Sequence, residues 1–177
     1  MLSVSVHYGY YKDFTGRHPT TAEAVAFAAT GMPIHNFWPG DEALDIALGP
    51  RRILYFFQPR WDTYATDIQT QIIANLKRFP KRKIYIVSEP NNTYFASQAM
   101  TPIQCAVAIR DYVHIIRQHC PDAEIYGPVM AQPGVVGIAD PFNYLRDTFN
   151  ALRKYPDGQQ ILSGLGLAIN YYRQGAD

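Results

Sequence analysis

One carboxylate in the sequence stands where a catalytic acid would be useful. Glu89 follows the apolar run 84–87 and precedes Pro90 and Asn91, in the segment IYIVSEPNN. A run of β-branched and aromatic residues that is bounded by proline and asparagine is typical of a short interior strand. Because proline disfavours helical backbone in the residue before it, the pattern predicts an extended Glu89 at the carboxyl end of that strand. Such a carboxyl group could exchange protons with a substrate, or it could be a surface glutamate that starts a loop.

Polar and aromatic side chains also end the other predicted strands. Sugar hydroxyls need directed hydrogen-bond partners, and the C–H face of a sugar stacks on aromatic rings. The set of side chains therefore favours a carbohydrate site over a phosphate site, although the two tryptophans could equally pack beneath loops. The candidate ligand-binding residues are His7, Tyr8, His35, Asn36, Trp38, Gln58, Trp61, Ser88, Asn91, Gln132, Asn170 and Tyr172.

Other chemistries are less well supported by these residues. His7 and His35 could be metal ligands, but two histidines without a placed carboxylate are more typical of hydrogen-bonded strand ends. Ser88 lacks the flanking glycines of a nucleophile elbow, which disfavours a serine hydrolase. We therefore expect neither a metal nor a cofactor.

Strand-like and helix-like segments alternate along the whole chain, and this order predicts an α/β fold with parallel strands joined by crossover helices. The first strand is not followed by a GxGxxG or GxxxxGK loop, which argues against a nucleotide-binding sheet. The predicted strands are 3–8, 32–38, 52–58, 83–87, 124–130 and 164–172. The predicted helices are 20–30, 41–48, 62–79, one that begins at Thr101-Pro102, and one that begins at Asp140-Pro141.

The length of these units indicates the kind of α/β fold. The six units in 177 residues average about 30 residues, and eight would need about 240, close to the ~250 of a (β/α)₈ barrel. We therefore predict that residues 1–177 form a single domain, an incomplete (β/α)₈ TIM barrel with about six βα units. In such a barrel the active site is built at the carboxyl ends of the strands, where the candidate residues lie.

Several helices carry local signals for their starts and buried faces. Thr20 with Glu23, and Thr101 with Gln104, fit capping boxes. Three apolar stripes at helical spacing predict the faces that pack on the sheet. They are Tyr64, Ile68, Ile72, Leu76 and Phe79; Cys105, Ile109, Tyr112, Val113 and Ile116; and Phe142, Leu145, Phe149 and Leu152. Cys105 and Cys120 are predicted on one helix, about 22 Å apart, so they cannot form a disulfide with each other.

The composition of the sequence indicates which classes of binding partner to expect. Sixteen basic and fifteen acidic residues give a formal net charge of +1, and no long basic cluster is present, so we expect no nucleic-acid partner. The sequence has neither a recognisable signal peptide nor an apolar run near ~18 residues, so we expect no membrane span. The expected partner is a carbohydrate substrate.

Three segments carry a family resemblance. IYIVSEPNN resembles the fourth-strand motif of the clan of retaining glycoside hydrolases with (β/α)₈ barrels, in which Asn-Glu-Pro supplies the acid/base glutamate. PDAEIYGPV is similar to the fifth strand, and GLGLAINYY resembles the sixth, which often ends in His-x-Tyr. The resemblance spans residues 80–172. It implies that Glu89 is the general acid/base and that Tyr172 assists the nucleophile.

The sequence departs from the clan pattern at two strand-end residues and lacks the second carboxylate. Ser88 stands where relatives carry an asparagine that binds a sugar hydroxyl, and Asn170 stands where they often carry histidine. The resemblance implies a nucleophile carboxylate ~5 to 5.5 Å from the acid, on a seventh strand that we expect to lie beyond this chain. The other acidic residues are at predicted helix starts, at the beginning of a strand or inside a helix, and none is a convincing replacement: Asp41, Asp62, Glu124, Asp140 and Asp147.

Two functions therefore remain open. The chain could be part of a retaining glycosidase that hydrolyses O-glycosidic bonds in the complete protein, and we expect the 177 residues alone to be inactive. Alternatively, it could be a non-catalytic barrel that binds carbohydrate or has a structural role, as the serine at position 88 suggests.

The expected opening in the barrel has a physical consequence. Unpaired backbone groups on the first and last strands favour pairing with other chains, so the isolated 177-residue chain should self-associate through its open barrel edges. Sedimentation velocity at several concentrations tests this. A monodisperse monomer that melts cooperatively would contradict the prediction.

Overall fold

The structure is a computed structural model of the 177-residue chain, and it describes residues 22, 26, 29, 34–36, 52–56, 60–93, 99–132 and 137–169. The predicted strand 3–8 and the predicted helix 41–48 lie outside these residues. Of the predicted helix 20–30, the structure describes Ala22, Ala26 and Ala29, which are all helical.

Five parallel strands form one sheet in the described part of the chain. They are β1 (Ile34–Asn36), β2 (Arg52–Phe56), β3 (Lys83–Ile86), β4 (Glu124–Met130) and β5 (Leu165–Ile169). Their order in the sheet follows their order in the sequence, and every neighbouring pair is parallel. This confirms the predicted α/β class and parallel pairing, and it confirms the bounds predicted for β4.

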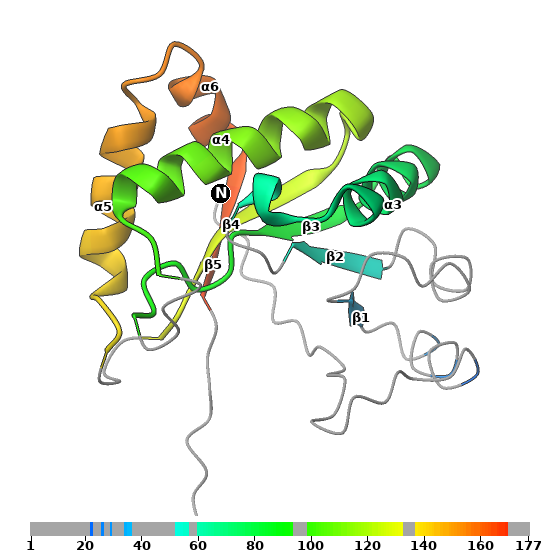
Figure 1. Cartoon of the computed structure of the whole chain (residues 1–177), viewed down its shortest axis with the longest axis horizontal. Coiled ribbons are helices and arrows are strands. Elements are labelled where there is room, and N and C mark those ends of the chain that lie inside the picture. The colour runs from blue at the N-terminus through cyan, green and yellow to red at the C-terminus, as the bar shows by residue number, and fades with distance from the viewer. Residues whose placement is uncertain are drawn as a thin grey trace, which may run out of the picture.

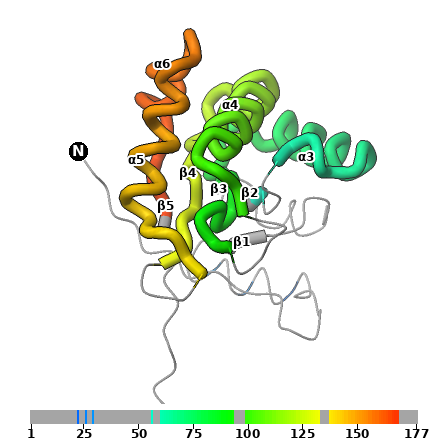
Figure 2. The backbone as a smooth tube through the Cα atoms, turned by 60° about the vertical axis from the view of Figure 1, so that its left-hand side comes forward, coloured from blue at the N-terminus to red at the C-terminus, as the bar shows by residue number. Residues whose placement is uncertain are grey.

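The helices cover one face of the sheet. The described helices after β2 are a 3₁₀ turn η2 (Trp61–Thr63), α3 (Thr66–Arg78), α4 (Pro102–His119), α5 (Pro141–Leu152) and α6 (Gly158–Ser163). Figure 1 shows α4 between α3 and α5, and Figure 2 shows α3 near β2 and α5 and α6 beside β5. None of the described helices is long and apolar enough to cross a membrane.

The main core lies between the sheet and this helical layer. Phe56, Ile84, Ile86 and Ile125 from the strands pack with buried residues of α3, α4 and α5. All five residues of the stripe predicted on α4 are buried, as are Ile72 and Leu76 on α3. On the other face of the sheet Tyr85 and Tyr126 stack with their ring centroids 5.1 Å apart, next to Val129. The alternation of the strand side chains thus separates a helix-facing core from an inner face.

The start of α4 confirms the predicted capping box. The Thr101 hydroxyl accepts from the backbone N–H of Gln104, and the Gln104 side chain accepts in return from the Thr101 N–H, with Pro102 at the first helical position. The two cysteines are buried and free, Cys105 within α4 and Cys120 as its C-cap.

The predicted helix 62–79 is wrong at its beginning. Residues 61–63 form the 3₁₀ turn η2, the backbone is extended at Tyr64 and Ala65, and α3 begins at Thr66. Gln69 explains the interruption, because its side-chain amide donates to the carbonyls of Trp61 and Tyr64 and so satisfies backbone groups that a continuous helix would pair.

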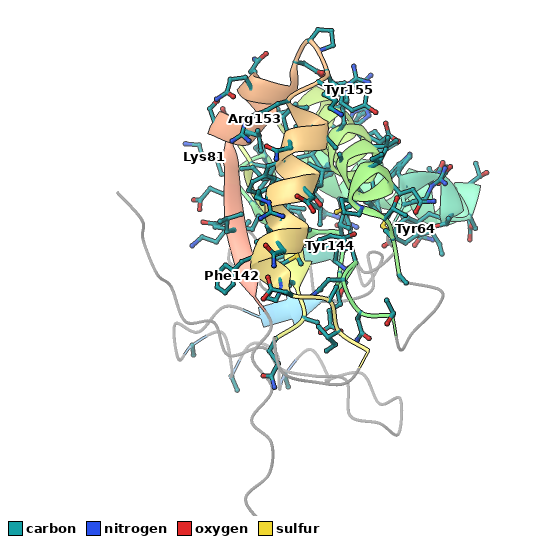
Figure 3. The ribbon with its side chains drawn as sticks, turned by 90° about the vertical axis from the view of Figure 1, so that its left-hand side faces the viewer. Tyr64, Lys81, Phe142, Tyr144, Arg153 and Tyr155 are labelled. Atoms are coloured by element: carbon teal, nitrogen blue, oxygen red, sulfur yellow. The ribbon has the colours of Figure 1, made fainter. Side chains whose placement is uncertain are left out.

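The buried face predicted for α5 is wrong at Phe142. This side chain is 67% exposed, whereas Tyr144 is buried and its hydroxyl donates to the Met100 carbonyl at 2.8 Å. Figure 3 shows Tyr144 on the side of α5 toward α4, and Phe142 on the side next to β5. The buried face therefore turns toward α4, and Phe142 falls at its outer edge, while Leu145 and Leu152 are buried as predicted.

The helix α6 was not predicted, because it has only six residues and begins within the sequence Pro156-Asp157-Gly158, which is typical of a turn. An ion-pair cluster joins it to α4. Asp157, its N-cap, accepts from the Arg110 guanidinium at 2.8 Å and pairs with His114. Arg110 also lies over the Tyr155 ring, with its guanidinium carbon 5.1 Å from the ring centroid.

The contacts of Asp157 should make the free energy of unfolding depend on pH. The Arg110 hydrogen bond, with a further one from His114, lowers the pKa of Asp157 to about 2. A carboxylate whose pKa is lower in the folded state contributes stability above about pH 4, and this contribution is lost as the pH falls toward 2. We expect Asp157→Asn to lower the free energy of unfolding at pH 6, and the difference from wild type to disappear near pH 2.

Urea unfolding of the two proteins from pH 6 to pH 2 measures this difference. Asp147→Asn, on the exposed face of α5, is the matched control and should change stability by less than about 0.5 kcal/mol. A difference that stays constant across the pH range would contradict the role given to Asp157.

Candidate functional site

The candidate site is at the carboxyl ends of β3 and β4, where the two strands lie side by side. Ser88 forms a parallel bridge with Val129, and the Glu89 N–H donates to the Val129 carbonyl at 2.7 Å. The segment after β3 thus remains attached to β4. Ser88, Glu89 and Asn91 are all buried, with exposed fractions of 3%, 5% and 1%. The surface-glutamate interpretation of Glu89 is therefore wrong.

The backbone around Glu89 differs from the prediction. Glu89 has a φ of 44° and Val87 a φ of 56°, so both adopt left-handed rather than extended conformations. Such conformations cost about 1–3 kcal/mol in residues other than glycine, and they persist where surrounding contacts fix them. Here Val87 accepts from the Val129 N–H at 2.9 Å, and Glu89 donates to Val129, so β4 holds both residues.

The Glu89 carboxylate has a neighbour that the sequence analysis missed. The side-chain amide of Asn92 donates to Glu89 Oε2 at 3.0 Å, and the Asn92 backbone N–H donates to the Glu89 carbonyl at 3.0 Å. Asn92 is 5% exposed. The spacing of three residues, which is that of a tight turn, was the signal that could have identified it.

Asn91 connects the loops that follow β3 and β4. Its Oδ1 accepts from the Ala131 N–H at 2.9 Å, and its Nδ2 donates to the carbonyls of Ala139, at 2.9 Å, and Ala131, at 3.3 Å. Both amide hydrogens and one acceptor position are therefore used inside the protein. Gln132 directly follows Ala131 and is half-buried.

A second set of contacts runs along the same two loops. The Thr93 N–H donates to the Gly137 carbonyl at 2.8 Å, and the Ala139 N–H donates to the Asn91 carbonyl at 2.9 Å. Between them, Asn92 and Ile138 form an antiparallel bridge. The turn that carries Glu89 is therefore fixed at both ends.

The remaining candidate residues lie elsewhere or outside the described residues. His35 and Asn36 are the last two residues of β1, so their backbone lies at the carboxyl edge of the sheet. Trp61 packs against Phe56 and Tyr112 with ring centroids 6.3 and 6.0 Å away, which places it in the helical layer. The candidates His7, Tyr8, Trp38, Gln58, Asn170 and Tyr172 lie outside the described residues.

The described residues offer little support for other chemistry. Within the described ranges, no three His, Cys, Asp or Glu side chains are grouped closely enough to hold a metal ion. Burial raises the pKa of the Cys105 thiol to about 12, which makes it a poor nucleophile. Glu124 is exposed at the start of β4, at the opposite end of the strand from Glu89, and the Asp140 carboxylate caps α5 by accepting from the Asn143 N–H at 2.7 Å.

The five parallel strands, ordered in the sheet as in the sequence, and the helices on one face (Figure 1) form an arrangement that matches part of a βα-barrel fold. Solved structures of two GH128 (subgroup II) endo-β-1,3-glucanases resemble the chain in fold. For the enzyme from Pseudomonas viridiflava the TM-score is 0.58 at 20% identity, over 86% of this chain and 58% of that one. For the enzyme from Sorangium cellulosum the TM-score is 0.52 at 14% identity, over 78% of this chain and 51% of that one.

The extent of these matches limits what they imply. The chain spans a little over half the length of either glucanase, and at these identities the likeness concerns the fold. No protein-family model and no curated protein matches the sequence. The predicted barrel fold is thus supported in part, by a match to about half of each glucanase structure.

Proposed function

We propose that, in the complete protein, this domain hydrolyses O-glycosidic bonds by a retaining double displacement, with Glu89 as the general acid/base. The observation that carries the proposal is the buried Glu89 carboxylate at the carboxyl edge of the sheet, held by Asn92. Burying a carboxylate and holding its backbone in a left-handed conformation both cost free energy, and such costs are characteristic of functional sites.

The proposed chemistry has two steps. First, the Glu89 carboxyl proton moves to the glycosidic oxygen as the bond from that oxygen to the anomeric carbon breaks, and a second carboxylate bonds to that carbon. Then the Glu89 carboxylate takes a proton from a water molecule, whose oxygen displaces the second carboxylate. This mechanism therefore requires a second carboxylate in addition to Glu89.

The substrate class follows from the structural neighbours. Both are endo-β-1,3-glucanases, so we propose a β-1,3-linked glucan as the first substrate to test. Proton NMR of the complete protein acting on a short β-1,3-glucan reveals the anomer that is released first. Initial release of the β-anomer supports a retaining mechanism, whereas initial release of the α-anomer, or no hydrolysis of any glycan tested, counts against it.

A non-catalytic barrel that binds carbohydrate is the second candidate, and Ser88 favours it. The clan carries a sugar-binding asparagine at this position, but Ser88 is shorter and only 3% exposed. Isothermal titration calorimetry distinguishes the two functions. Binding of β-1,3-glucan with no release of reducing ends would support the binding module, and release of reducing ends that depends on Glu89 would exclude it.

A further inference from the structure

The turn formed by Glu89 and Asn92 is closed by two hydrogen bonds between the same two residues. One joins the backbone N–H of Asn92 to the carbonyl of Glu89, and the other joins the Asn92 amide to Glu89 Oε2, each at 3.0 Å. A carboxyl group that accepts one hydrogen bond from a fixed donor loses rotational freedom about its terminal torsion. The second bond therefore acts on the orientation of the carboxyl group.

The donor is itself held in place. The Asn92 backbone bridges Ile138, and its neighbours on either side, Asn91 and Thr93, bond to Ala139 and Gly137. With its side chain also buried, Asn92 has little freedom to follow a moving carboxylate. The orientation of Glu89 is thus tied, through Asn92, to the loop that follows β4.

We propose that Asn92 is a positioning residue for the proton transfer: its bond to Oε2 directs Oε1 of Glu89 toward the glycosidic oxygen. This inference rests on the proposed function. It also gives the adjacent asparagines separate roles, since Asn91 holds the two loops together and Asn92 orients the acid. Misplacing a reacting group by about 1 Å can cost on the order of 10²-fold in rate.

The test compares two substrates that share the same sugar but differ in leaving group. In a 2,4-dinitrophenyl glycoside of a short β-1,3-glucan, the dinitrophenolate leaving group departs without being protonated. In the glucan itself, the leaving sugar oxygen must be protonated by an acid. For Asn92→Ala in the complete protein, we expect kcat/KM on glucan to fall about 10-fold and kcat/KM on the dinitrophenyl glycoside to stay within about 2-fold. A merely structural role would lower both values equally.

Two further variants complete the design. Asn92→Asp keeps the shape but removes the donor, so it should show at least the same selective loss, and it replaces the alanine variant if that variant melts below the assay temperature. Asn75→Ala removes an exposed amide that bonds only Gln71 among the described contacts, and it should change neither rate. Equal losses on both substrates, or no loss, would overturn the role of Asn92.

Glu89→Ala in the same assay separates this inference from the proposed function. If Glu89→Ala lowers glucan cleavage far more than cleavage of the dinitrophenyl glycoside and Asn92→Ala does not, only the positioning role fails. If Glu89→Ala lowers the cleavage of both substrates equally, or of neither, then both the positioning role of Asn92 and the proposed acid/base function of Glu89 fail.

Discussion

Glu89→Gln is expected to lower the hydrolysis of β-1,3-glucan by the complete protein about 10³-fold, within the range that general acid/base groups contribute. Glutamine is close in size to glutamate, and its amide oxygen can still accept from Asn92 Nδ2, so the buried turn should remain intact. It cannot supply the proton that the leaving oxygen needs. Release of reducing ends measures the rate, and thermal unfolding checks that the variant folds.

Glu124→Gln is the matched control, because it makes the same chemical change at the opposite end of β4, where the side chain is 60% exposed. It should retain the wild-type rate. Glu89→Ala adds a chemical signature, since azide can attack the glycosyl-enzyme in the space left by the carboxylate and give a β-glycosyl azide from the dinitrophenyl substrate. Wild-type activity in Glu89→Gln, or an α-glycosyl azide, would refute the assignment.

Local signals were enough to predict the scaffold that holds this site. The run from Glu124 to Met130 has strand-forming residues between turn signals, and β4 has the predicted bounds. The side chains of Thr101 and Gln104 each accept from the other residue's backbone N–H. Because both residues lie within four positions, the start of α4 could be identified without tertiary information. Features of this kind are signalled by neighbours in the sequence, so they can be recognised before the tertiary fold is known.

The conformation of Glu89 could not be predicted in this way. The preference of a residue before proline for extended backbone is a local effect, and it is overridden here by hydrogen bonds to Val129, which is 40 residues further along the chain. Val87, a β-branched residue, is left-handed for the same reason. Two unfavourable local conformations are tolerated because pairing with β4 compensates for them.

The roles of the two asparagines also depend on distant residues. Asn91 is predicted from the sequence as a sugar ligand, and the motif gives no role to Asn92. Loop 137–139 pairs with the turn and so distinguishes the two residues. The Asn91 amide faces Ala131 and Ala139, and the Asn92 amide faces Glu89. The sequence motif thus identified the segment, but the contacts of each residue within it depend on the tertiary structure.

Asn91→Ala is expected to lower the free energy of unfolding by about 2–4 kcal/mol, which is large for one polar side chain. The substitution leaves the N–H and the carbonyl of Ala131 without their partner, and Ala131 is fully buried. Each buried group left unsatisfied costs about 1–3 kcal/mol. Ala139 is exposed, so its carbonyl can bond water instead and adds little. Urea unfolding of the complete protein measures the change.

The nature of the loss can be tested with a variant that keeps the shape. Asn91→Asp still offers an oxygen to the Ala131 N–H, but it places a buried carboxylate against the Ala131 carbonyl oxygen, which then lacks its donor. If hydrogen bonding rather than volume explains the loss, the aspartate variant should be at least as unstable as the alanine variant at pH 7, because burying an unpaired charge is more costly than burying an unpaired neutral group. Asn75→Ala in α3, which removes one exposed hydrogen bond to the Gln71 carbonyl, should change stability by less than about 0.5 kcal/mol. An Asn91→Asp protein as stable as wild type would show that Asn91 acts by filling space.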